Sequence, residues 1–224
     1  MSEMTIQPCF MNFIAQETLK DIDNTKLTNL IYKQQSQDPG RKISNIGGWQ
    51  SNLLDIVDIK CIEELKPLVE IVEDRADIIY NYFQFKKFLK PRMSGMWMNI
   101  NKPRDYNEPH SHSDFLVGVY YINVPDNSGY IEFETPILHH SDVISPFTVE
   151  TFNEYNSTHF KLYPKSGLLV IFPSWLIHSV SPNDSDSDRL SLAFNIQLIN
   201  REESKNFDKI TEISKTKRQA VPNY

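Results

Sequence analysis

The chain has 224 residues, of which 40% are hydrophobic and 23% are charged. This length suits one domain with a sizeable core and is too short for two ordinary enzyme domains, so we expect a single functional site. No run approaches the roughly 18 apolar residues that a membrane span needs. The net charge of −6 argues against nucleic acid as the main partner, because phosphate binding needs a local excess of Lys and Arg.

The amino-terminal segment and the cysteines give a simple expectation about location. The first twenty residues contain no basic stretch followed by a long apolar run, so they do not predict a secretory signal. Cys9 and Cys61 stand far apart and lack a C-x-x-C partner, so neither a disulfide framework nor a thiolate zinc site is indicated. We therefore expect a cytoplasmic protein, and the composition leaves its oligomeric state open.

Residues 1–92 are expected to form a mainly helical buttress within the same domain. Apolar residues recur at three- and four-residue spacing in residues 24–35 and 62–88, which is the period of an amphipathic helix. Between these segments lies Gly-Gly-Trp-Gln-Ser at residues 47–51, which predicts a tight turn with Trp49 as an apolar anchor.

Residues 93–200 are expected to form the core of the fold. Short β-rich runs such as MWMNI, FLVGVYYINV and LSLAFNIQLI alternate with turn sequences, a pattern typical of an all-β sandwich or jelly roll. Residues 136–158 predict a long insertion that contacts substrate, because long loops in compact domains are often lids. Trp97 and Trp175 are candidates for the pocket wall or the core. Residues 201–224 predict a short helix and a tail.

Three side chains with metal-binding chemistry alternate just ahead of an apolar strand. On an extended segment, His110, His112 and Asp114 lie on one face. An imidazole and a carboxylate two residues apart give two adjacent ligands to one metal ion. A third, distant ligand would complete a triangular face and leave positions open for a co-substrate and oxygen.

The third ligand and an anion-binding group follow later in the chain. His178 lies among strand residues, where an unpaired imidazole needs a partner, so it supplies the distant ligand. Eleven positions later comes Arg189, whose planar guanidinium binds a carboxylate with two parallel hydrogen bonds. Ser191 falls on the same strand face and adds a hydroxyl. No catalytic side chain is predicted beyond this metal site.

An H-x-D triplet alone is a weak signal, and single histidines are more often structural. The ordered combination of H-x-D, a strand histidine and R-x-S eleven positions later, in an all-β context, favours a metal site beside an anion site.

The sequence resembles the 2-oxoglutarate- and Fe(II)-dependent oxygenases, and more closely a group of uncharacterised bacterial and phage members. The shared motifs cover most of the chain: GGWQS at 47–51, W-x-N at 97–99, P-H-x-H at 109–112, G-V-Y-Y at 118–121, F-P-S-W-L-x-H at 172–178 and R-x-S-x-A-F-N at 189–195. The resemblance implies a double-stranded β-helix of jelly-roll type that uses Fe(II), 2-oxoglutarate and O2. It implies a hydroxylase of a peptidyl substrate, for example prolyl, or of a small molecule.

The resemblance also implies roles for single residues. It makes His178 the distal iron ligand, while Arg189 and Ser191 hold the far carboxylate of 2-oxoglutarate. By similarity to prolyl hydroxylases, Tyr121 also reaches this co-substrate.

The first two iron ligands have two alternative registers. When the chain is aligned on the usual P-H-x-D motif, the pair is His110 and His112. When it is aligned on H-x-D, the pair is His112 and Asp114. We favour His112, Asp114 and His178, because a carboxylate makes the ordinary facial triad, and this choice leaves His110 beside the metal or facing the substrate.

Two other functions fit parts of the pattern. A cupin-like metalloenzyme would use several histidine ligands without 2-oxoglutarate, but it would not need Arg189. A non-catalytic binding module on an oxygenase fold would need neither iron nor turnover. Succinate formation that depends on 2-oxoglutarate separates these alternatives from an oxygenase.

Overall fold

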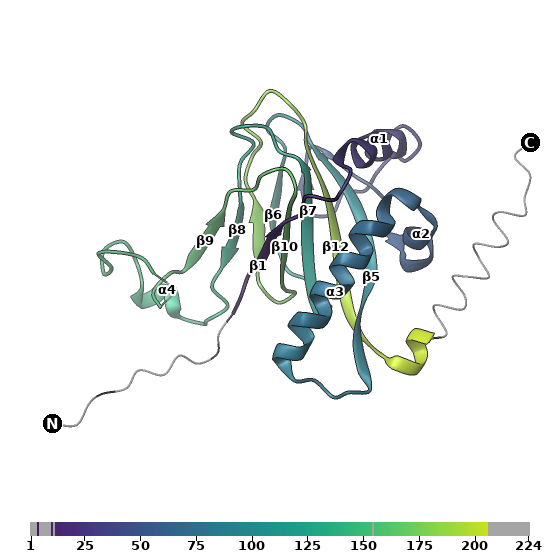
Figure 1. Cartoon of the computed structure of the whole chain (residues 1–224). Helices are drawn as coiled ribbons and strands as arrows, with labels where there is room; N and C mark the ends of the chain where they lie inside the picture. Colours follow the sequence, from purple (N-terminus) through teal and green to yellow (C-terminus); the bar gives the residue numbers. More distant parts are fainter. Residues whose placement is uncertain (1–3, 5–9, 11, 154, 206–224) are drawn as a thin grey trace, which may run out of the picture.

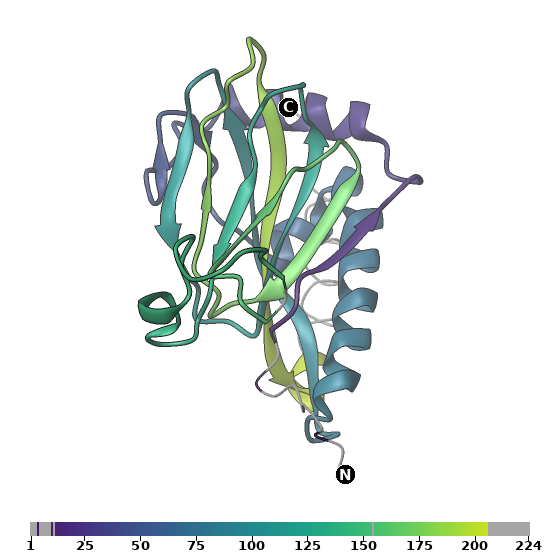
Figure 2. The ribbon, with the colours of Figure 1, turned by 90° about the vertical axis from the view of Figure 1, so that its left-hand side faces the viewer.

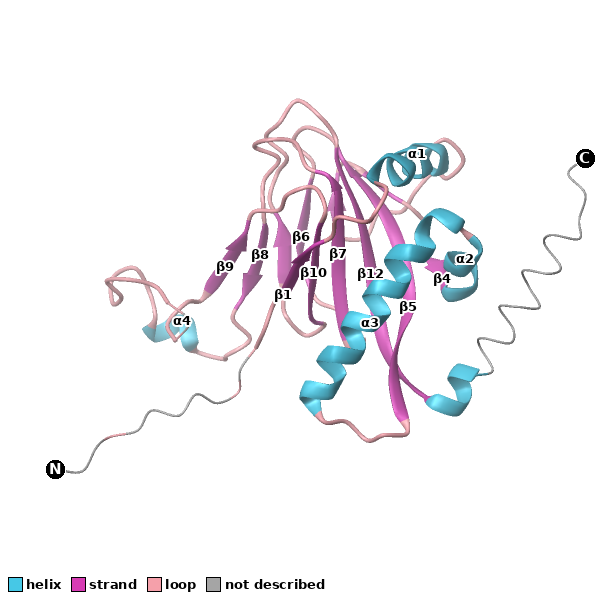
Figure 3. Cartoon of the chain, viewed as in Figure 1, coloured by secondary structure: helices cyan, strands magenta, loops and turns pink. Residues whose placement is uncertain are grey.

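The computed structural model describes residues 4, 10, 12–153 and 155–205. In this part of the chain, seven strands form one antiparallel sheet and five form a second. The order of the larger sheet is β1-β10-β7-β12-β5-β3, with β4 also pairing with β5, and that of the smaller sheet is β2-β6-β11-β8-β9 (Figure 1, Figure 3). The predicted fold class, a mainly β jelly roll with flanking helices, is confirmed.

The larger sheet contains β1 (Ala15–Thr18), β3 (Trp49–Gln50), β4 (Leu54–Asp55), β5 (Leu89–Asn101), β7 (Leu116–Asn123), β10 (Leu168–Pro173) and β12 (Arg189–Asn200). The smaller sheet contains β2 (Asn45–Ile46), β6 (Tyr106–His110), β8 (Ile131–Glu134), β9 (His159–Leu162) and β11 (His178–Val180). The helices are α1 (Asn24–Gln35), α2 (Ile56–Cys61), the 3-10 helix η1 (Glu63–Leu65), α3 (Lys66–Phe83) and α4 (His140–Val143).

Two apolar cores lie on opposite faces of the larger sheet. The first joins α3 and the other amino-terminal helices to the outward face, and includes Met98, Leu192 and Phe194. The second fills the space between the two sheets, where Val119 of the larger sheet and Phe133 of the smaller sheet are buried together. Because side chains alternate along a strand, neighbouring residues of β5, β7 and β12 contribute to different layers.

Helix α3 covers the outward face of the larger sheet (Figures 1 and 2). A proline stands in its first turn, where no intrahelical N–H bond is lost. Its buried residues follow helical spacing: Leu68, Val69, Val72, Ala76, Ile79 and Tyr80. The helix ends at Gln84, whose left-handed conformation (φ 50°) stops it before the predicted limit of residue 88.

The first predicted helix, residues 24–35, is confirmed as α1. The Asp23 side chain accepts a hydrogen bond from the Lys26 N–H and caps it, while Leu27 and Ile31 are buried one turn apart. The region before residue 93 also contributes four short strands, β1 to β4, which the sequence analysis did not predict. These short strands pair with longer strands of both sheets. The region before residue 93 therefore contributes to the β-sandwich as well as supplying the helices that pack on it.

The carboxy-terminal prediction is only partly covered. Residues 201–205 are helical, and residues 206–224 of the predicted tail lie outside the described residues. Within the described chain, no helix has both the length and the apolar character needed to cross a membrane.

Candidate metal and co-substrate site

Pairing of two strands brings together histidines that are far apart in the sequence. In the antiparallel pair β6–β11, His178 is directly opposite His110, and their ring centroids are 4.3 Å apart. His112 follows two residues after His110 and lies on the same side, with its ring centroid 5.4 Å from that of His178. The candidate ligand nitrogens of the three rings lie within 4.8 Å of one another, so small rotations can direct all three to one ion.

Two of these imidazoles are oriented by backbone carbonyl groups. The Nδ1 of His110 lies 2.8 Å from the Glu108 carbonyl oxygen, and the Nδ1 of His178 lies 3.0 Å from that of Leu176. A carbonyl oxygen can only accept, so each Nδ1 must donate its hydrogen, which leaves the Nε2 lone pair free. This arrangement, with one ring nitrogen held by a carbonyl group, is usual for histidines that bind metals.

The imidazoles of His112 and His178 are kept neutral. Burial, together with a smaller effect of the nearby His110, lowers the pKa of His112 to about 4 and that of His178 to about 3. A metal ligand must offer an unprotonated nitrogen, so the site is ready for a cation at neutral pH. The Trp97 ring stacks on His112, with 5.9 Å between centroids, and limits the positions that this imidazole can take.

Asp114 is not part of the histidine cluster. The cluster found among the described residues consists of His110, His112 and His178. The backbone bends after His112, because Phe115 enters the core against the rings of Phe83 and Phe85.

The bend breaks the strand alternation on which the H-x-D register depends. The Asp114 carboxylate lies 3.5 Å from the Ser94 hydroxyl. The backbone carbonyl oxygen of Asp114 accepts a hydrogen bond from the Ser174 hydroxyl. Burial raises the pKa of this carboxyl group. The geometry therefore favours the other register, with His110 and His112 as the pair.

Arg189 is a buried cation that lacks a full set of partners. It is 1% exposed, and its Nη1 donates to the carbonyl oxygen of Ser128. Its Nη2 has no partner, and neither does the buried hydroxyl of Ser128. No carboxylate among the described residues forms an ion pair with this guanidinium. An unpaired buried cation is costly, so this end of the site is built for an anion.

Ser191 and Tyr121 surround the same end of the pocket. Ser191 is paired with Tyr121 on one side, and it shares the inward face of β12 with Arg189. Burial raises the pKa of Tyr121 to about 12 although the Arg189 charge opposes this, so its phenol keeps a proton to donate. The structure thus brings together Arg189, Ser191 and Tyr121, all three of which line the pocket that also holds the histidines.

The pocket lies between the two sheets and has a volume of about 730 Å³ including its open mouth. One wall is apolar and includes Val117, Val119, Ile131 and Phe172. The other wall is rich in neutral polar groups and includes Ser44, Gln50, Asn99, Asn101 and Asn107.

Most of this polar wall was not predicted. The alternation in Trp97-Met98-Asn99-Ile100-Asn101 was a usable signal, because every second residue of this strand is polar or amphipathic. Trp97 lines the pocket, as one alternative proposed. Trp175 does not: it is 46% exposed, and its indole N–H donates to Asn12.

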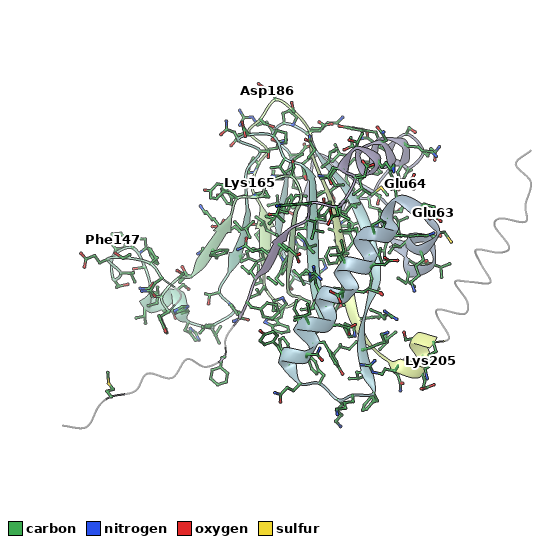
Figure 4. All side chains as sticks on the ribbon, in the orientation of Figure 1. Glu63, Glu64, Phe147, Lys165, Asp186 and Lys205 are labelled. Carbon is green, nitrogen blue, oxygen red and sulfur yellow. The ribbon has the colours of Figure 1, made fainter. Side chains whose placement is uncertain are left out.

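The insertion at residues 136–158 extends away from the sandwich beyond β8 and β9 (Figure 1). Phe147, labelled in Figure 4, is 99% exposed near its outer end. None of the described residues of this insertion lines the pocket, so the expected substrate contacts are not present in this conformation.

Comparisons with known proteins agree with this geometry. Residues 95–195, from β5 to β12, match the family described as "Putative 2OG-Fe(II) oxygenase". No curated protein sequence matches the chain.

Solved structures with the same fold include enzymes of different activities. A prolyl-4-hydroxylase from Pseudomonas putida matches with 14% identity and a TM-score of 0.57, over 82% of this chain and 92% of its own. The carbocyclase SnoK from nogalamycin biosynthesis matches with 13% identity and a TM-score of 0.58, over 82% and 79%. A viral collagen prolyl hydroxylase from Paramecium Bursaria Chlorella virus-1, in complex with 2-oxoglutarate, matches with 14% identity and a TM-score of 0.51, over 82% and 94%. At these identities the likeness establishes the fold.

Proposed function

We propose that this chain, a 2-oxoglutarate- and Fe(II)-dependent oxygenase that consumes O2, binds its iron through His110, His112 and His178. In this proposal it hydroxylates a peptidyl or small-molecule substrate. Arg189, Ser191 and Tyr121 hold the 2-oxoglutarate.

The donor set suits Fe(II). Imidazole nitrogen is a normal ligand for iron, and three ligands on one face leave the opposite positions open. Imidazoles bind a metal ion as neutral ligands, and burial already holds His112 and His178 in that form. A dication bound by neutral ligands keeps its full charge, which favours an anionic co-substrate at the open positions.

Arg189 suits the other end of 2-oxoglutarate. Its unpaired Nη2 offers a donor that a carboxylate can accept from, and Ser191, which lines the same pocket, adds a hydroxyl. The Tyr121 phenol stays protonated and adds a further donor. A dicarboxylate anchored here is oriented with its keto-acid end toward the histidines.

When bound, iron and 2-oxoglutarate supply the oxidation, in which 2-oxoglutarate is decarboxylated to succinate and a substrate C–H bond is hydroxylated. The protein positions these groups and excludes water. Val117, Val119 and Phe172 form the dry wall that serves the second task.

The observation that carries the proposal is the placement of a buried, partly unpaired arginine in the same pocket as three clustered imidazoles. The direct test is release of labelled carbon dioxide from 2-oxoglutarate labelled at its keto-acid carboxylate. We expect release that requires both Fe(II) and O2. Absence of release from protein fully loaded with iron would contradict the proposal.

The ligand register has its own test. We expect His110→Ala to lose iron binding and Asp114→Asn to retain it, as measured by equilibrium dialysis. The two variants change neighbouring positions on the same segment, so each serves as the control for the other. Iron retained by His110→Ala and lost by Asp114→Asn would restore the H-x-D register.

A further inference from the structure

Gln50 is a buried polar side chain that the proposed chemistry does not use. It is 7% exposed and lines the pocket, and its carboxamide makes no hydrogen bond within the described chain. The carboxamide borders the pocket rather than packed protein, so its donor and acceptor are open to a ligand. The other residues of the turn at 47–51 hold Gln50 in this position.

The residues around Gln50 anchor the strand. Trp49 points into the outer core, and its Nε1 donates to the Asp38 carbonyl oxygen at 2.9 Å. The Ser51 hydroxyl accepts from the Met98 N–H at 3.0 Å, and the Ser51 N–H donates to the Met98 carbonyl oxygen at 2.9 Å. Fixed on both sides, Gln50 faces the opposite direction from Trp49 and into the pocket.

The preceding glycine leads the chain into this strand. Gly47 has a φ of +72°, and a Cβ atom there would lie 1.9 Å from the Asp105 carboxylate. The same carboxylate accepts from the Lys102 N–H at 2.7 Å and holds the facing loop in place. Only glycine fits this approach, so the turn that carries Gln50 is a fixed feature of the fold.

Asn99 lies directly beside Gln50. The two residues are opposite each other in the β3–β5 pair, and Asn99 is also opposite Ser191 in β12. Like that of Gln50, the Asn99 carboxamide has no hydrogen-bond partner among the described residues. The next amides along this wall are already engaged: Asn101 donates to Asn107 at 3.4 Å, and Asn107 to Ser44 at 3.3 Å.

The charge of the pocket limits what this pair can bind. Among the described residues that line the pocket, Arg189 carries a permanent charge, and no aspartate, glutamate or lysine is present. The proposed function assigns Arg189 to 2-oxoglutarate. The surface left for the substrate is therefore neutral, with donors and acceptors side by side.

We infer that Gln50 and Asn99 recognise an amide group of the substrate, either a peptide bond or a carboxamide, through paired hydrogen bonds. An amide donates and accepts in one plane, as the two carboxamides do. A carboxylate cannot donate and an ammonium cannot accept, so each leaves part of this wall unpaired. This inference rests on the proposed function, because it takes Arg189 to be occupied by 2-oxoglutarate.

The test uses protein loaded with Zn(II) and 2-oxoglutarate, which binds without turnover, and three probes with one skeleton. All three are N-acetylpyrrolidines that differ in the group on C2: N-acetyl-prolinamide carries a neutral carboxamide, N-acetyl-proline an anionic carboxylate and N-acetyl-2-(aminomethyl)pyrrolidine a cationic ammonium group. Binding is measured by ligand-observed NMR titration. We expect the neutral probe to bind most tightly and Gln50→Met, which keeps the size of the side chain, to weaken it about 10-fold.

Two further variants define the role of Gln50. Gln50→Glu should favour the cationic probe over the neutral one. Gln16→Glu, which adds the same charge at an exposed position on β1 outside the pocket, should leave the order of the probes unchanged. Failure of the neutral probe to bind, equal binding of charged probes, or unchanged binding by Gln50→Met would each overturn the inference.

The affinity for 2-oxoglutarate separates this inference from the proposed function. Gln50→Met should bind 2-oxoglutarate as the unaltered protein does, and a 10-fold loss would assign Gln50 to the co-substrate and overturn its role toward substrate. If the unaltered protein binds no 2-oxoglutarate, the proposed function fails. If the unaltered protein binds 2-oxoglutarate but Gln50→Met binds the neutral probe with unchanged affinity, this inference alone fails.

Discussion

The two faces of β5 and β12 have opposite properties, although their residues alternate along the same strands. The outward face packs on α3 with apolar side chains: Met96, Met98, Ile100, Leu190, Leu192, Phe194 and Ile196, all buried. The inward face carries the pocket: Trp97, Asn99, Asn101, Arg189, Ser191 and Ala193. The period of two in a strand thus separates the residues that stabilise the fold from those that bind ligands.

This difference teaches where each kind of substitution should act. Changes on the outward face should lower the free energy of unfolding and spare the ligand affinities of the folded protein. Changes on the inward face should weaken ligand binding and leave the free energy of unfolding largely unchanged, because the polar groups of that face are placed to bind ligands rather than one another.

The largest effect is expected from the pocket side. His178→Ala removes one of three clustered imidazoles, and we expect iron binding to be lost and turnover to fall at least about 1000-fold. Dialysis against Fe(II) and succinate formation measure the two effects. His159→Ala, at an exposed position of the edge strand β9, is the control and should change neither. Iron binding retained by His178→Ala would refute the three-histidine site.

Phe194→Ala should have the largest effect on the outward face. The ring is fully buried against Gly118, and its removal should lower the free energy of unfolding by about 3–5 kcal/mol. Chemical denaturation measures this loss. The Phe194 ring also lines the pocket beside Gly118, so the separation of the two faces is tested with Leu192→Ala, which removes an equally buried side chain that does not line the pocket. The affinity of its folded fraction for 2-oxoglutarate should stay within about 2-fold, and a much larger loss would show that the two faces are not separable.

Gly118→Ala tests the same contact from the opposite side. A Cβ atom there would lie 2.4 Å from the Phe194 ring and 2.5 Å from the Val170 carbonyl oxygen. We expect a loss of about 1–3 kcal/mol in the free energy of unfolding. Adding Phe194→Leu should restore only part of it, because the Val170 backbone cannot move away as a side chain can. Full recovery in the double variant would contradict this account of the clash.

The smallest effect is expected at Trp97, which stacks on His112 without itself binding metal. Trp97→Leu should weaken iron binding about 10-fold, since groups that orient a ligand typically matter at this level. Trp175→Leu removes a tryptophan outside the pocket and should leave iron affinity unchanged. Equal losses in the two variants would indicate a general effect of losing a large ring.

Strand period explains how much of this site could be predicted from the sequence. His110 and His112 share a side because the segment is extended, and Arg189 and Ser191 share a face for the same reason. The position of Asp114 could not be predicted, since it depends on Phe115 packing against rings from a distant segment.

Other features depend on contacts that a local pattern does not reveal. Strands β2, β3 and β4 have two residues each, and only their pairing with β5 and β6 defines them. The turn at residues 47–51 was predicted as a loop with an apolar anchor. That it presents Gln50 to the pocket follows from β3 lying beside Asn99.

The most direct test of the central claim is the affinity of Arg189→Met for 2-oxoglutarate, measured with metal-loaded protein by calorimetric titration. Methionine fills much of the same space without the charge. We expect the affinity to fall at least about 100-fold while metal affinity is unchanged. Without 2-oxoglutarate, the free energy of unfolding should not decrease, because the variant removes a buried cation that lacks a full set of partners. An Arg189→Met variant that binds 2-oxoglutarate as tightly as the unaltered protein would contradict the account.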